Sequence, residues 1–560
     1  MEKVWLKNYP AGVPEHINTD NYDSLVSLIE QSLTKYADKN AFTNLGVTLT
    51  FKQLDEKSKQ FASYLQHTLK LKKGARVAIM MPNLLQYPIT LYGILRAGMV
   101  AVNVNPMYTS RELRHQLSDS GAEAIIILAN FAHVLADVID ETPIRRIVVT
   151  EIADMCPWPK RSLLNWLIKS VKKMVPEFNL PNYDGFVDAL NKGKTKAFTQ
   201  VDITKDDIAF LQYTGGTTGV AKGAVLTHNN MLSNVLQSKA WFTTALNTDD
   251  EVIITALPLY HIFSLTANCL LFTEIGGMNI LITNPRDMPG FVKELQKHRF
   301  TGFTGVNTLF NALLNTPGIE KVDFSHLKMS FGGGMAVQPS VAKEWGELTN
   351  TVMIEGYGLT ETSPAAVVNP MDAKEFSGCI GLPISSTEIS IRDDDGNELG
   401  FNEPGELCIR GPQVMRGYWQ RPEATAESIT DDGWFATGDV ATVNEEGFVK
   451  LVDRKKDMIL VSGFNVYPNE LESVIAEHPK ILELAAIGVP DEKCGEVVKL
   501  FIVAKSKDLT KEEVLAFCKK NLTGYKRPKH IEFLDELPKS NVGKILRKDL
   551  RPPATEGDAT

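Results

Sequence analysis

The chain has 560 residues, of which 43% are hydrophobic and 23% are charged, and its mean hydropathy is -0.11. This length and composition indicate a folded globular protein of roughly three to four compact units, and they exclude a disordered or membrane-embedded chain. The formal net charge of -9 argues against a nucleic-acid partner, because duplex binding usually needs a basic face.

The cysteines and the first residues bear on the compartment. The 6 cysteines lie far apart, with no C-x-x-C pair and no cluster with histidine at zinc spacing, so we expect reduced packing residues. Residues 1–7 lack the apolar core of a signal peptide, which predicts a cytoplasmic protein. The most hydrophobic window, residues 79–104, is interrupted by Pro82, Pro88 and Arg96, so no transmembrane span is predicted.

The first 150 residues have the pattern of an α/β fold. Apolar residues at helical spacing predict two amphipathic helices within residues 22–70. A short strand at 77–80, a helix at 84–96 and a strand at 100–103 form the β-α-β signature of a parallel sheet. A helix is predicted over 109–120, and the unbroken apolar run 124–128 is typical of a parallel strand covered on both faces.

Residues 160–175 have a basic, amphipathic helical pattern. One stripe of the helix is apolar, cationic side chains point elsewhere, and a tryptophan suits an interface. The apolar stripe contains Leu164, Leu167, Ile168, Val171 and Val175. The cationic side chains are Lys169, Lys172 and Lys173, and the tryptophan is Trp166. The pattern fits peripheral contact with a membrane surface, and it fits an ordinary surface helix packed on its own domain equally well.

A loop rich in glycine and threonine follows an apolar strand, at residues 213–223. Glycines let backbone N–H groups turn inward as an anion-binding nest, threonines add hydroxyl donors, and Lys222 adds a positive charge. Lys222 is followed by Gly223 and then by a second strand, so the loop is not a Walker A motif and we expect a hairpin tip that grips a polyphosphate. The alternative is a flexible surface turn, but hairpin loops usually have only about 2 to 5 residues.

The remaining chain changes from alternating strands and helices to two smaller units. A buried strand at 252–257 ends in Pro258, Leu259, Tyr260 and His261. Short alternating strands between 388 and 452 predict a small antiparallel barrel, and residues 393–396 predict a hairpin turn rather than a calcium loop. Beyond Asp453 we expect a compact α+β unit with helices at 468–478 and 510–521 and strands at 484–489 and 497–504.

Four further stretches have compositions that core packing does not require. Residues 331–335 contain three consecutive glycines, and residues 355–361 place an aromatic residue, a hydroxyl and a carboxylate near glycines. Residues 434–439 end in Asp439, and residues 538–547 contain Lys544. Taken singly, each also fits a tight turn, a capping residue or a solvated charge, because charged residues are mostly exposed.

Together with the loop at 213–223, these stretches match in order and spacing the adenylate-forming acyl-CoA synthetase superfamily, and the resemblance covers nearly the whole chain. It is strongest to the bacterial long-chain fatty acid–CoA ligases of β-oxidation, through residues 213–223, 258–261 and 433–468. The resemblance implies an α/β fold with a large N-terminal adenylation domain at 1–452, which includes a small antiparallel β-barrel around 366–452. A small mobile α+β domain at 453–560 would carry the catalytic lysine.

The resemblance also implies the reaction. A long-chain fatty acid and Mg·ATP would give an acyl-adenylate and diphosphate, and CoA would then take the acyl group and release AMP. This activity would feed β-oxidation and be coupled to fatty acid uptake. The sequence has no G-x-S-x-G elbow and gives no reason to choose a catalytic cysteine, which agrees with substrates that supply both nucleophiles. Peripheral contact with the inner face of the cytoplasmic membrane and a homodimer are both compatible with the resemblance.

The resemblance assigns roles to individual residues. The catalytic residues would be Lys544, Thr214, Glu361 and His261, with Glu361 and Thr214 holding Mg²⁺. The ATP and AMP site would comprise Tyr213, Thr214, Gly215, Gly216, Thr217, Thr218, Gly219, Lys222, Gly333, Gly334, Glu355, Gly356, Tyr357, Gly358, Thr360, Asp439 and Arg454. CoA would contact Ser462, Gly463 and Phe464. Rotation about Asp453 and Arg454 would present Lys544 in the first half-reaction and the Gly463 region in the second.

Three alternatives remain open at this point. Within the superfamily these are a medium-chain or aryl-CoA ligase, or a luciferase-like oxygenase that adenylates first. A P-loop ATPase or kinase would release ADP instead of AMP. A non-catalytic lipid-binding protein at the membrane would keep the helix at 160–175 but would have no use for Asp439, Lys544 and the glycine loops together.

Overall fold

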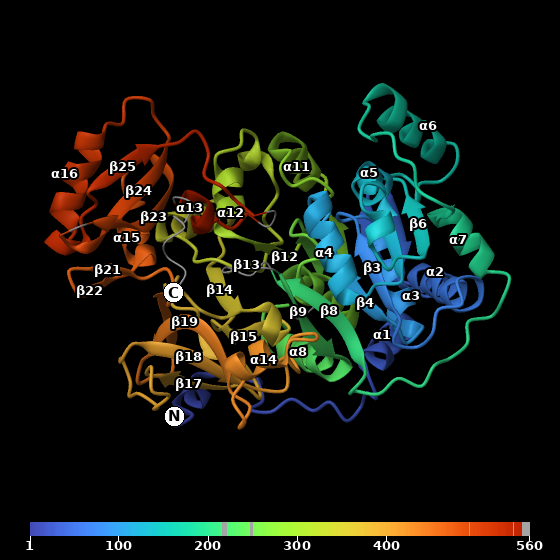
Figure 1. Cartoon of the computed structure of the whole chain (residues 1–560), viewed down its shortest axis with the longest axis horizontal. Helices are drawn as coiled ribbons and strands as arrows, with labels where there is room; N and C mark the ends of the chain where they lie inside the picture. Colours follow the sequence, from blue (N-terminus) through green and yellow to red (C-terminus); the bar gives the residue numbers. More distant parts are fainter. Residues whose placement is uncertain (215–220, 247–249, 492, 541–542, 552–560) are drawn as a thin grey trace.

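The computed structural model describes residues 1–214, 221–246, 250–491, 493–540 and 543–551. Within these residues a seven-stranded and a nine-stranded sheet form the large N-terminal part, and two smaller sheets complete the molecule (Figure 1). The C-terminal sheet and its helices form a separate lobe beside the nine-stranded sheet. The fold is therefore mixed α/β with a small C-terminal α+β unit, as predicted, whereas the boundary after residue 452 stays a prediction.

The seven-stranded sheet carries the predicted β-α-β units. Its order is β7-β6-β5-β3-β4-β8-β9, and all neighbours are parallel except β8 and β9. Its strands are β3 (Arg76–Met80), β4 (Val100–Asn103), β5 (Ala124–Leu128), β6 (Arg146–Thr150), β7 (Tyr183–Gly185), β8 (Ile208–Thr214) and β9 (Lys222–Thr227). The helices near it are α3 (Gln86–Arg96), α4 (Ser110–Ser120), α5 (Ala132–Ala136) and α7 (Phe186–Gly193). Thr109 and Glu112 form a capping box that starts α4, which confirms the predicted start.

The nine-stranded sheet has the order β16-β15-β14-β13-β12-β10-β11-β1-β2. It is parallel from β14 to β1 and antiparallel at both ends. Its strands are β1 (Asn40–Asn44), β2 (Val47–Thr50), β10 (Val252–Thr255), β11 (Met278–Leu281), β12 (Gly302–Gly305), β13 (Met329–Gly333), β14 (Met353–Gly358), β15 (Ala365–Val368) and β16 (Leu382–Pro383). The helices of this region are α1 (Leu25–Lys35), α2 (Phe51–Ser63), α8 (His228–Phe242), α9 (Ile262–Ser264), α10 (Leu271–Ile275), α11 (Met288–Leu295), α12 (Asn307–Leu314) and α13 (Pro339–Thr349).

The two smaller sheets contain the five predicted strands and four that were not predicted, β19, β21, β22 and β25, and the region of the predicted barrel is a four-stranded antiparallel sheet. The antiparallel sheet β17-β18-β19-β20 contains β17 (Glu388–Arg392), β18 (Gly405–Arg410), β19 (Phe435–Val443) and β20 (Val449–Arg454), with α14 (Pro422–Ser428) beside it. The C-terminal unit contains β21 (Ile459–Val461), β22 (Phe464–Val466), α15 (Pro468–Ile475), β23 (Ile481–Asp491), β24 (Gly495–Ala504), α16 (Lys511–Asn521) and β25 (His530–Phe533). One face of its sheet packs on the two helices, and the chain after β25 covers part of the other face.

Short 3-10 and π segments connect these elements. They are η1 (Val4–Asn8), η2 (Tyr64–Thr68), η3 (Ala129–Phe131), η4 (Ile139–Glu141), η5 (Leu167–Val171), η6 (Leu265–Leu270), η7 (Ile319–Lys321), η8 (Thr360–Thr362), η9 (Gly524–Lys526) and η10 (Arg547–Leu550).

The basic amphipathic segment folds as α6 (Lys160–Trp166) followed directly by η5, and it projects from the body of the molecule (Figure 1). Four stripe residues, Leu164, Leu167, Ile168 and Val175, are half-buried. The fifth stripe residue, Val171, is exposed, and so are the apolar side chains of Trp158, Leu163, Trp166 and Met174. Among the described residues, none of the helices is both long and apolar enough to cross a bilayer.

Candidate active site

Strands β8 and β9 pair as the predicted antiparallel hairpin, and the phosphate role of this hairpin stays a prediction. Thr214 is paired with Lys222 in the antiparallel register, so these two residues stand at the base of the tip. The predicted phosphate-binding residues Gly215, Gly216, Thr217, Thr218 and Gly219 lie outside the described residues. Tyr213 turns its side chain to α4, where its hydroxyl donates to Asp119 Oδ2 at 2.7 Å. Tyr213 therefore anchors the hairpin through Asp119.

The predicted adenine region is built from the ends of β13 and β14. These parallel strands place Gly333 beside Gly356, and Gly334 follows with a φ of +78°. A Cβ on Gly356 would come within 2.3 Å of Phe331 Cζ, so this position accepts glycine alone without rearrangement. The rings of Phe331 and Phe263 fill the space that side chains on Gly356 and Gly333 would occupy.

Glu355 occupies the same strand but faces the protein interior. Its Oε1 accepts a hydrogen bond from the Val337 backbone N–H at 2.8 Å, and its side chain is buried. Burial raises the pKa of this carboxyl to about 7. Because Val337 closes the loop that begins at Gly334, Glu355 holds this loop in place.

A carboxylate, a phenol and a guanidinium meet at the junction of β14, β19 and β20. Tyr357 donates from its hydroxyl to Asp439 Oδ2 at 2.6 Å, and Arg454 Nε lies 3.3 Å from Asp439 Oδ1. The antiparallel register of β19 and β20 pairs Asp439 with Arg454, which explains how residues 15 positions apart come together. Asp439 is 5% exposed, and burial raises the pKa of its carboxyl while Arg454 opposes the shift.

Lys544 belongs to the C-terminal unit and lies near the group formed by Tyr357, Asp439 and Arg454. Backbone and side-chain hydrogen bonds join Lys544 to Ser540, and Thr308 Oγ1 on α12 donates to the Gly543 carbonyl at 2.9 Å. The Lys544 side chain approaches Gly334, because a Cβ built on Gly334 would lie 3.1 Å from Lys544 Cε. Burial and the charge of Arg454 lower the pKa of Lys544 to about 8, while Asp439 and Glu361 act in the opposite direction. The structure thus brings Lys544, Arg454, Asp439 and Glu361 together.

Glu361 lies in η8, just after Thr360, and is 8% exposed. Its Oε1 accepts a hydrogen bond from the Tyr418 hydroxyl at 2.8 Å. The Lys222 ammonium lies 5.2 Å from the centre of the Tyr418 ring. Tyr418 therefore connects the end of the phosphate hairpin to the carboxylate.

The donor set around Glu361 suits a hard cation that arrives with a nucleotide. Among the described residues, no group of three or more His, Cys, Asp and Glu side chains could hold a metal ion alone. Mg²⁺ usually takes one or two carboxylates together with phosphate oxygens and water. Glu361 supplies one such carboxylate, η8 lies near β8, whose last residue is Thr214, and the metal role of these two residues stays a prediction.

His261 follows β10 in a segment that is fixed by buried amides. Asn83 Oδ1 accepts from the Leu259 N–H at 2.8 Å, and Gln212 Nε2 donates to the Tyr260 carbonyl at 2.8 Å. Burial, with the nearby Lys544 charge, lowers the pKa of His261 to about 3. Its Nδ1 accepts from the Phe263 N–H at 3.3 Å, so the neutral ring carries its hydrogen on Nε2 and is available there as a donor.

The residues predicted for CoA are not brought to this group. Ser462, Gly463 and Phe464 lie in the exposed β21–β22 hairpin on the outer side of the C-terminal unit (Figure 1). Gly463 has a φ of +83°, and the Phe464 ring stacks on Tyr525 with a centroid distance of 4.7 Å. Lys544 and the hairpin thus occupy different sides of the same unit.

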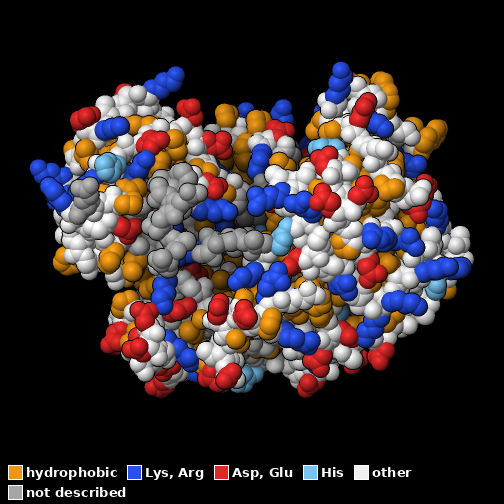
Figure 2. Space-filling model, in the orientation of Figure 1, with side chains coloured by type: hydrophobic (Ala, Val, Ile, Leu, Met, Phe, Trp, Pro, Cys, Tyr) orange, Lys and Arg blue, Asp and Glu red, His pale blue; other side chains and the backbone are white. Residues whose placement is uncertain are grey.

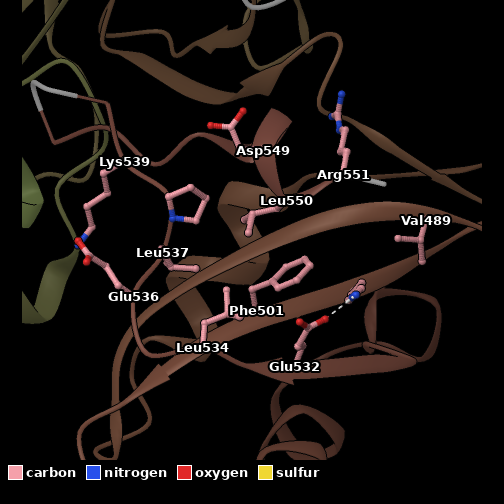
Figure 3. A pocket seen from close by; sticks show the side chains of 12 residues that line it. Val489, Phe501, Glu532, Leu534, Glu536, Leu537, Lys539, Asp549, Leu550 and Arg551 are labelled. Atoms are coloured by element: carbon pink, nitrogen blue, oxygen red, sulfur yellow. Dashed lines mark ion pairs between the residues drawn. The ribbon is translucent and has the colours of Figure 1, made fainter. Parts of the chain in front are cut away.

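Lys and Arg side chains gather where the C-terminal unit meets the rest of the molecule on the face that Figure 2 shows. Such a basic surface attracts a polyphosphate. A groove of about 790 Å³ lies elsewhere, on the C-terminal unit between its sheet and the chain after β25 (Figure 3). Its floor is apolar at Phe501, Leu534 and Leu537, and the Lys499–Glu532 ion pair stands at its rim. None of the predicted site residues lines this groove.

Several residues of the site were missed by the sequence predictions. Tyr418, Thr308, Asn83 and Gln212 touch predicted site residues or fix the segments that carry them. A signal exists for Tyr418, because the run Arg416, Gly417, Tyr418 and Trp419 places two aromatic residues after a glycine in a loop. Thr308, Asn83 and Gln212 have no such signal, since each acts through contacts that are distant in the chain.

The mixed sheets and the small C-terminal unit are those of adenylate-forming enzymes. The model of the AMP-binding enzyme family matches residues 29–419, and the model of the AMP-binding enzyme C-terminal domain matches residues 470–544. The chain belongs to the AMP-binding enzyme family.

The similar proteins agree with this membership. A long-chain-fatty-acid–CoA ligase of Escherichia coli O157:H7 is 58% identical over 551 residues, which cover 98% of each chain. A long-chain-fatty-acid–CoA ligase of Haemophilus influenzae is 53% identical, again over 98% of each chain. The crystal structure of an anthranilate CoA ligase in complex with anthranoyl-AMP has a TM-score of 0.83 at 24% identity and covers 96% of this chain and 97% of its own. The similarity to this crystal structure is evidence for the fold only.

Proposed function

We propose that this protein is a long-chain fatty acid–CoA ligase that works through an acyl-adenylate. The observation that carries the proposal is the meeting of Lys544 from the C-terminal unit with Glu361 of η8 and with Asp439 and Arg454 of the β17–β20 sheet. Such a group suits the transfer of a nucleotide to a carboxylate, because its cations neutralise charge around a phosphate. The two relatives above, at 58% and 53% identity over nearly the whole chain, support the long-chain substrate.

In the first half-reaction a fatty carboxylate oxygen attacks the α-phosphorus of ATP, the bond between the α-phosphorus and the bridging oxygen breaks, and diphosphate leaves. The base of the hairpin at Thr214 and Lys222 would hold the β- and γ-phosphates. Asp439 would accept the ribose hydroxyls, and Tyr357 with the Gly333 and Gly356 backbone would bound the adenine. Lys544 would stabilise the negative charge that shifts from the carboxylate to the α-phosphate.

In the second half-reaction the sulfur of CoA attacks the acyl carbonyl and AMP leaves. We propose that the C-terminal unit then turns to present Gly463, which is consistent with its exposed position on the other side of that unit. His261 would contribute its Nε2–H as a hydrogen-bond donor near the acyl group. Mg²⁺ would be held by Glu361 and Thr214 together with phosphate oxygens, where it supplies charge neutralisation to the triphosphate.

The products test this proposal against its rivals. Purified protein with oleate, CoA and Mg·ATP should release AMP and diphosphate in equal amounts with oleoyl-CoA. Release of ADP would instead indicate a kinase or ATPase, and nucleotide binding without turnover would indicate a binding protein. The alternative within the family is a medium-chain or aryl-CoA ligase, which would prefer octanoate or 4-coumarate to oleate at equal concentration.

We further propose that the α6–η5 segment contacts an anionic membrane surface, where long-chain fatty acids partition. Trp158, Leu163 and Trp166 are 78%, 57% and 56% exposed, which is unusual for large apolar side chains. Lys169, Lys172 and Lys173 are exposed beside them, and Figure 2 shows hydrophobic and cationic side chains together on this projection. An apolar patch with cations around it matches the interface of a bilayer that contains acidic lipids.

Changing Lys169, Lys172 and Lys173 to Glu should weaken co-flotation with phosphatidylglycerol vesicles, while acyl-CoA formation from a micellar substrate stays unchanged. A matched control changes the exposed Lys511, Lys519 and Lys520 of α16 to Glu, which alters the net charge equally on the other side of the molecule. Equal flotation of parent and the α6–η5 variant would contradict the membrane proposal and leave the ligase proposal intact.

A further inference from the structure

Tyr418 stands between two groups of the site that belong to different parts of the chain. Its hydroxyl donates to Glu361 Oε1 at 2.8 Å, and its ring lies beneath the Lys222 ammonium at 5.2 Å. Glu361 is 8% exposed, so its carboxylate has little freedom and little water around it. A phenol that donates to a buried carboxylate sets which oxygen of that carboxylate remains available to a ligand.

The backbone around Tyr418 is fixed from both sides. The Gly417 carbonyl accepts from the Val225 N–H at 2.9 Å, and the Trp419 N–H donates to the Gly223 carbonyl at 2.8 Å, so this segment pairs with β9, the second strand of the phosphate hairpin. The Met415 N–H donates to the Glu361 carbonyl at 2.7 Å. The segment therefore holds the base of the hairpin and the turn of Glu361 in one frame.

A glycine in this segment allows Tyr418 its position. Gly417 has a φ of +150°, and a Cβ there would lie 2.6 Å from Thr425 Cγ2 of α14. The Tyr418 N–H in turn donates to Thr425 Oγ1 at 2.9 Å. The helix thus fixes the tyrosine backbone, and the phenol has a defined direction toward Glu361.

We propose that Tyr418 is a positioning residue of the nucleotide site: its hydroxyl holds one oxygen of Glu361 so that the other oxygen is directed at the Mg²⁺ of bound Mg·ATP. This inference rests on the proposed function through the metal role of Glu361. Side chains that orient a metal-binding carboxylate typically change metal affinity about ten-fold to a hundred-fold when they are removed.

The test is Tyr418→Phe, which keeps the ring beside Lys222 and removes only the hydroxyl. ATP binding is measured by titration calorimetry without fatty acid or CoA, first without divalent cation and then over a series of Mg²⁺ concentrations. We expect the Mg²⁺ concentration for half-maximal enhancement of ATP binding to rise about ten-fold, whereas metal-free ATP binding stays at the parent value. An unchanged Mg²⁺ dependence in a folded Tyr418→Phe protein would overturn the proposal.

Two further proteins separate positioning from a general structural role. Tyr64→Phe is the matched control, because the Tyr64 hydroxyl also donates to a carboxylate, Asp184 Oδ2 at 2.7 Å, far from this group. It should lower the melting temperature and leave the Mg²⁺ dependence unchanged. In Glu361→Gln, adding Tyr418→Phe should produce no further shift. An equal further shift in the double variant would overturn the proposal, since Tyr418 would then act without Glu361.

The two proposals fail in different ways. If the parent protein made no acyl-CoA from any fatty acid and the Tyr418→Phe shift still occurred, the ligase proposal would fail and the positioning role of Tyr418 would stand. If oleoyl-CoA formed normally and the Mg²⁺ dependence of ATP binding did not respond to Tyr418→Phe, the positioning role alone would fail.

Discussion

Replacement of Lys544 by alanine tests whether this side chain acts in the first half-reaction and not in the second. Lys544 is the cation that the C-terminal unit brings to Asp439 and Glu361, and its side chain lies against Gly334. Loss of one preorganised charge donor typically costs about a hundred-fold to a thousand-fold in rate. We therefore expect Lys544→Ala to lower ATP–diphosphate exchange by about that factor.

The second half-reaction should be spared in the same variant. Thiolysis is measured by adding CoA to chemically prepared oleoyl-adenylate and following oleoyl-CoA, so that the adenylation step is bypassed. A change smaller than about three-fold is expected, because Lys544 is assigned to the first step only. Equal loss in both half-reactions would refute this reasoning and would indicate damage to the fold or a role in both steps.

The pH dependence of adenylation gives an independent estimate of how much the Lys544 charge contributes to the rate. Burial and Arg454 lower the pKa of this lysine to about 8, and the role proposed for Lys544 requires the protonated form. The lysine is then about nine-tenths protonated at pH 7 and about one-tenth protonated at pH 9, so kcat/KM for ATP in adenylation should fall about ten-fold as pH rises between these values. A flat profile up to pH 9, or the same fall in Lys544→Ala, would contradict the assignment.

Three further predictions follow from particular contacts. Asp439→Asn should raise the KM for ATP about ten-fold to a hundred-fold, because hydrogen bonds to a charged group contribute about 1.5–3 kcal/mol; unchanged KM would contradict the ribose role. Thr308→Val removes the donor to the Gly543 carbonyl at 2.9 Å, so diphosphate exchange should fall about five-fold while thiolysis is unchanged, and equal effects on both steps would contradict it. Gly358→Ala would place a Cβ 1.9 Å from the Pro364 carbonyl oxygen, so urea unfolding should show a loss of about 3 kcal/mol, whereas Gly524→Ala, with open space at Cβ, serves as the control; equal stability of the two variants would contradict the close approach.

Much of the local structure follows from sequence pattern because the deciding interactions are local. The capping box of Thr109 and Glu112 needs only residues three apart, and it starts α4 where the pattern predicts. Strand β5 is buried along its whole length, and its unbroken apolar run indicates this directly. The hairpin of β8 and β9 is likewise a contact between neighbours in the chain.

Other features depend on contacts that no local pattern contains. Strand β1 joins the nine-stranded sheet beside β11, with Phe42 paired to Asn279. The sequence pattern of residues 22–70 predicts two helices and does not predict this strand. The resemblance lists Glu355 with the nucleotide-binding residues, and only the structure shows that its carboxyl accepts a hydrogen bond from the Val337 N–H. The outer apolar face of α6 and η5 is another example, because periodicity identifies a stripe but not which side the protein covers.

The candidate site also combines features that the sequence predicts with features that only the structure shows. Glycine loops, Asp439 and Lys544 stand out by composition, and their resemblance to one family links them. Their spatial meeting depends on how the C-terminal unit sits against α12, through Thr308 and through Asn311, whose Nδ2 donates to the Leu482 carbonyl at 3.2 Å. Tyr418 gains its importance only when the carboxylate it touches is known.

The most direct test of the account is fatty acid-dependent ATP–diphosphate exchange across a panel from acetate to oleate, with benzoate and 4-coumarate included. We predict that exchange is strongest with palmitate and oleate, that it requires Lys544, and that AMP accumulates only when CoA is added. Exchange that occurs with acetate or the aromatic acids and not with palmitate or oleate would contradict it.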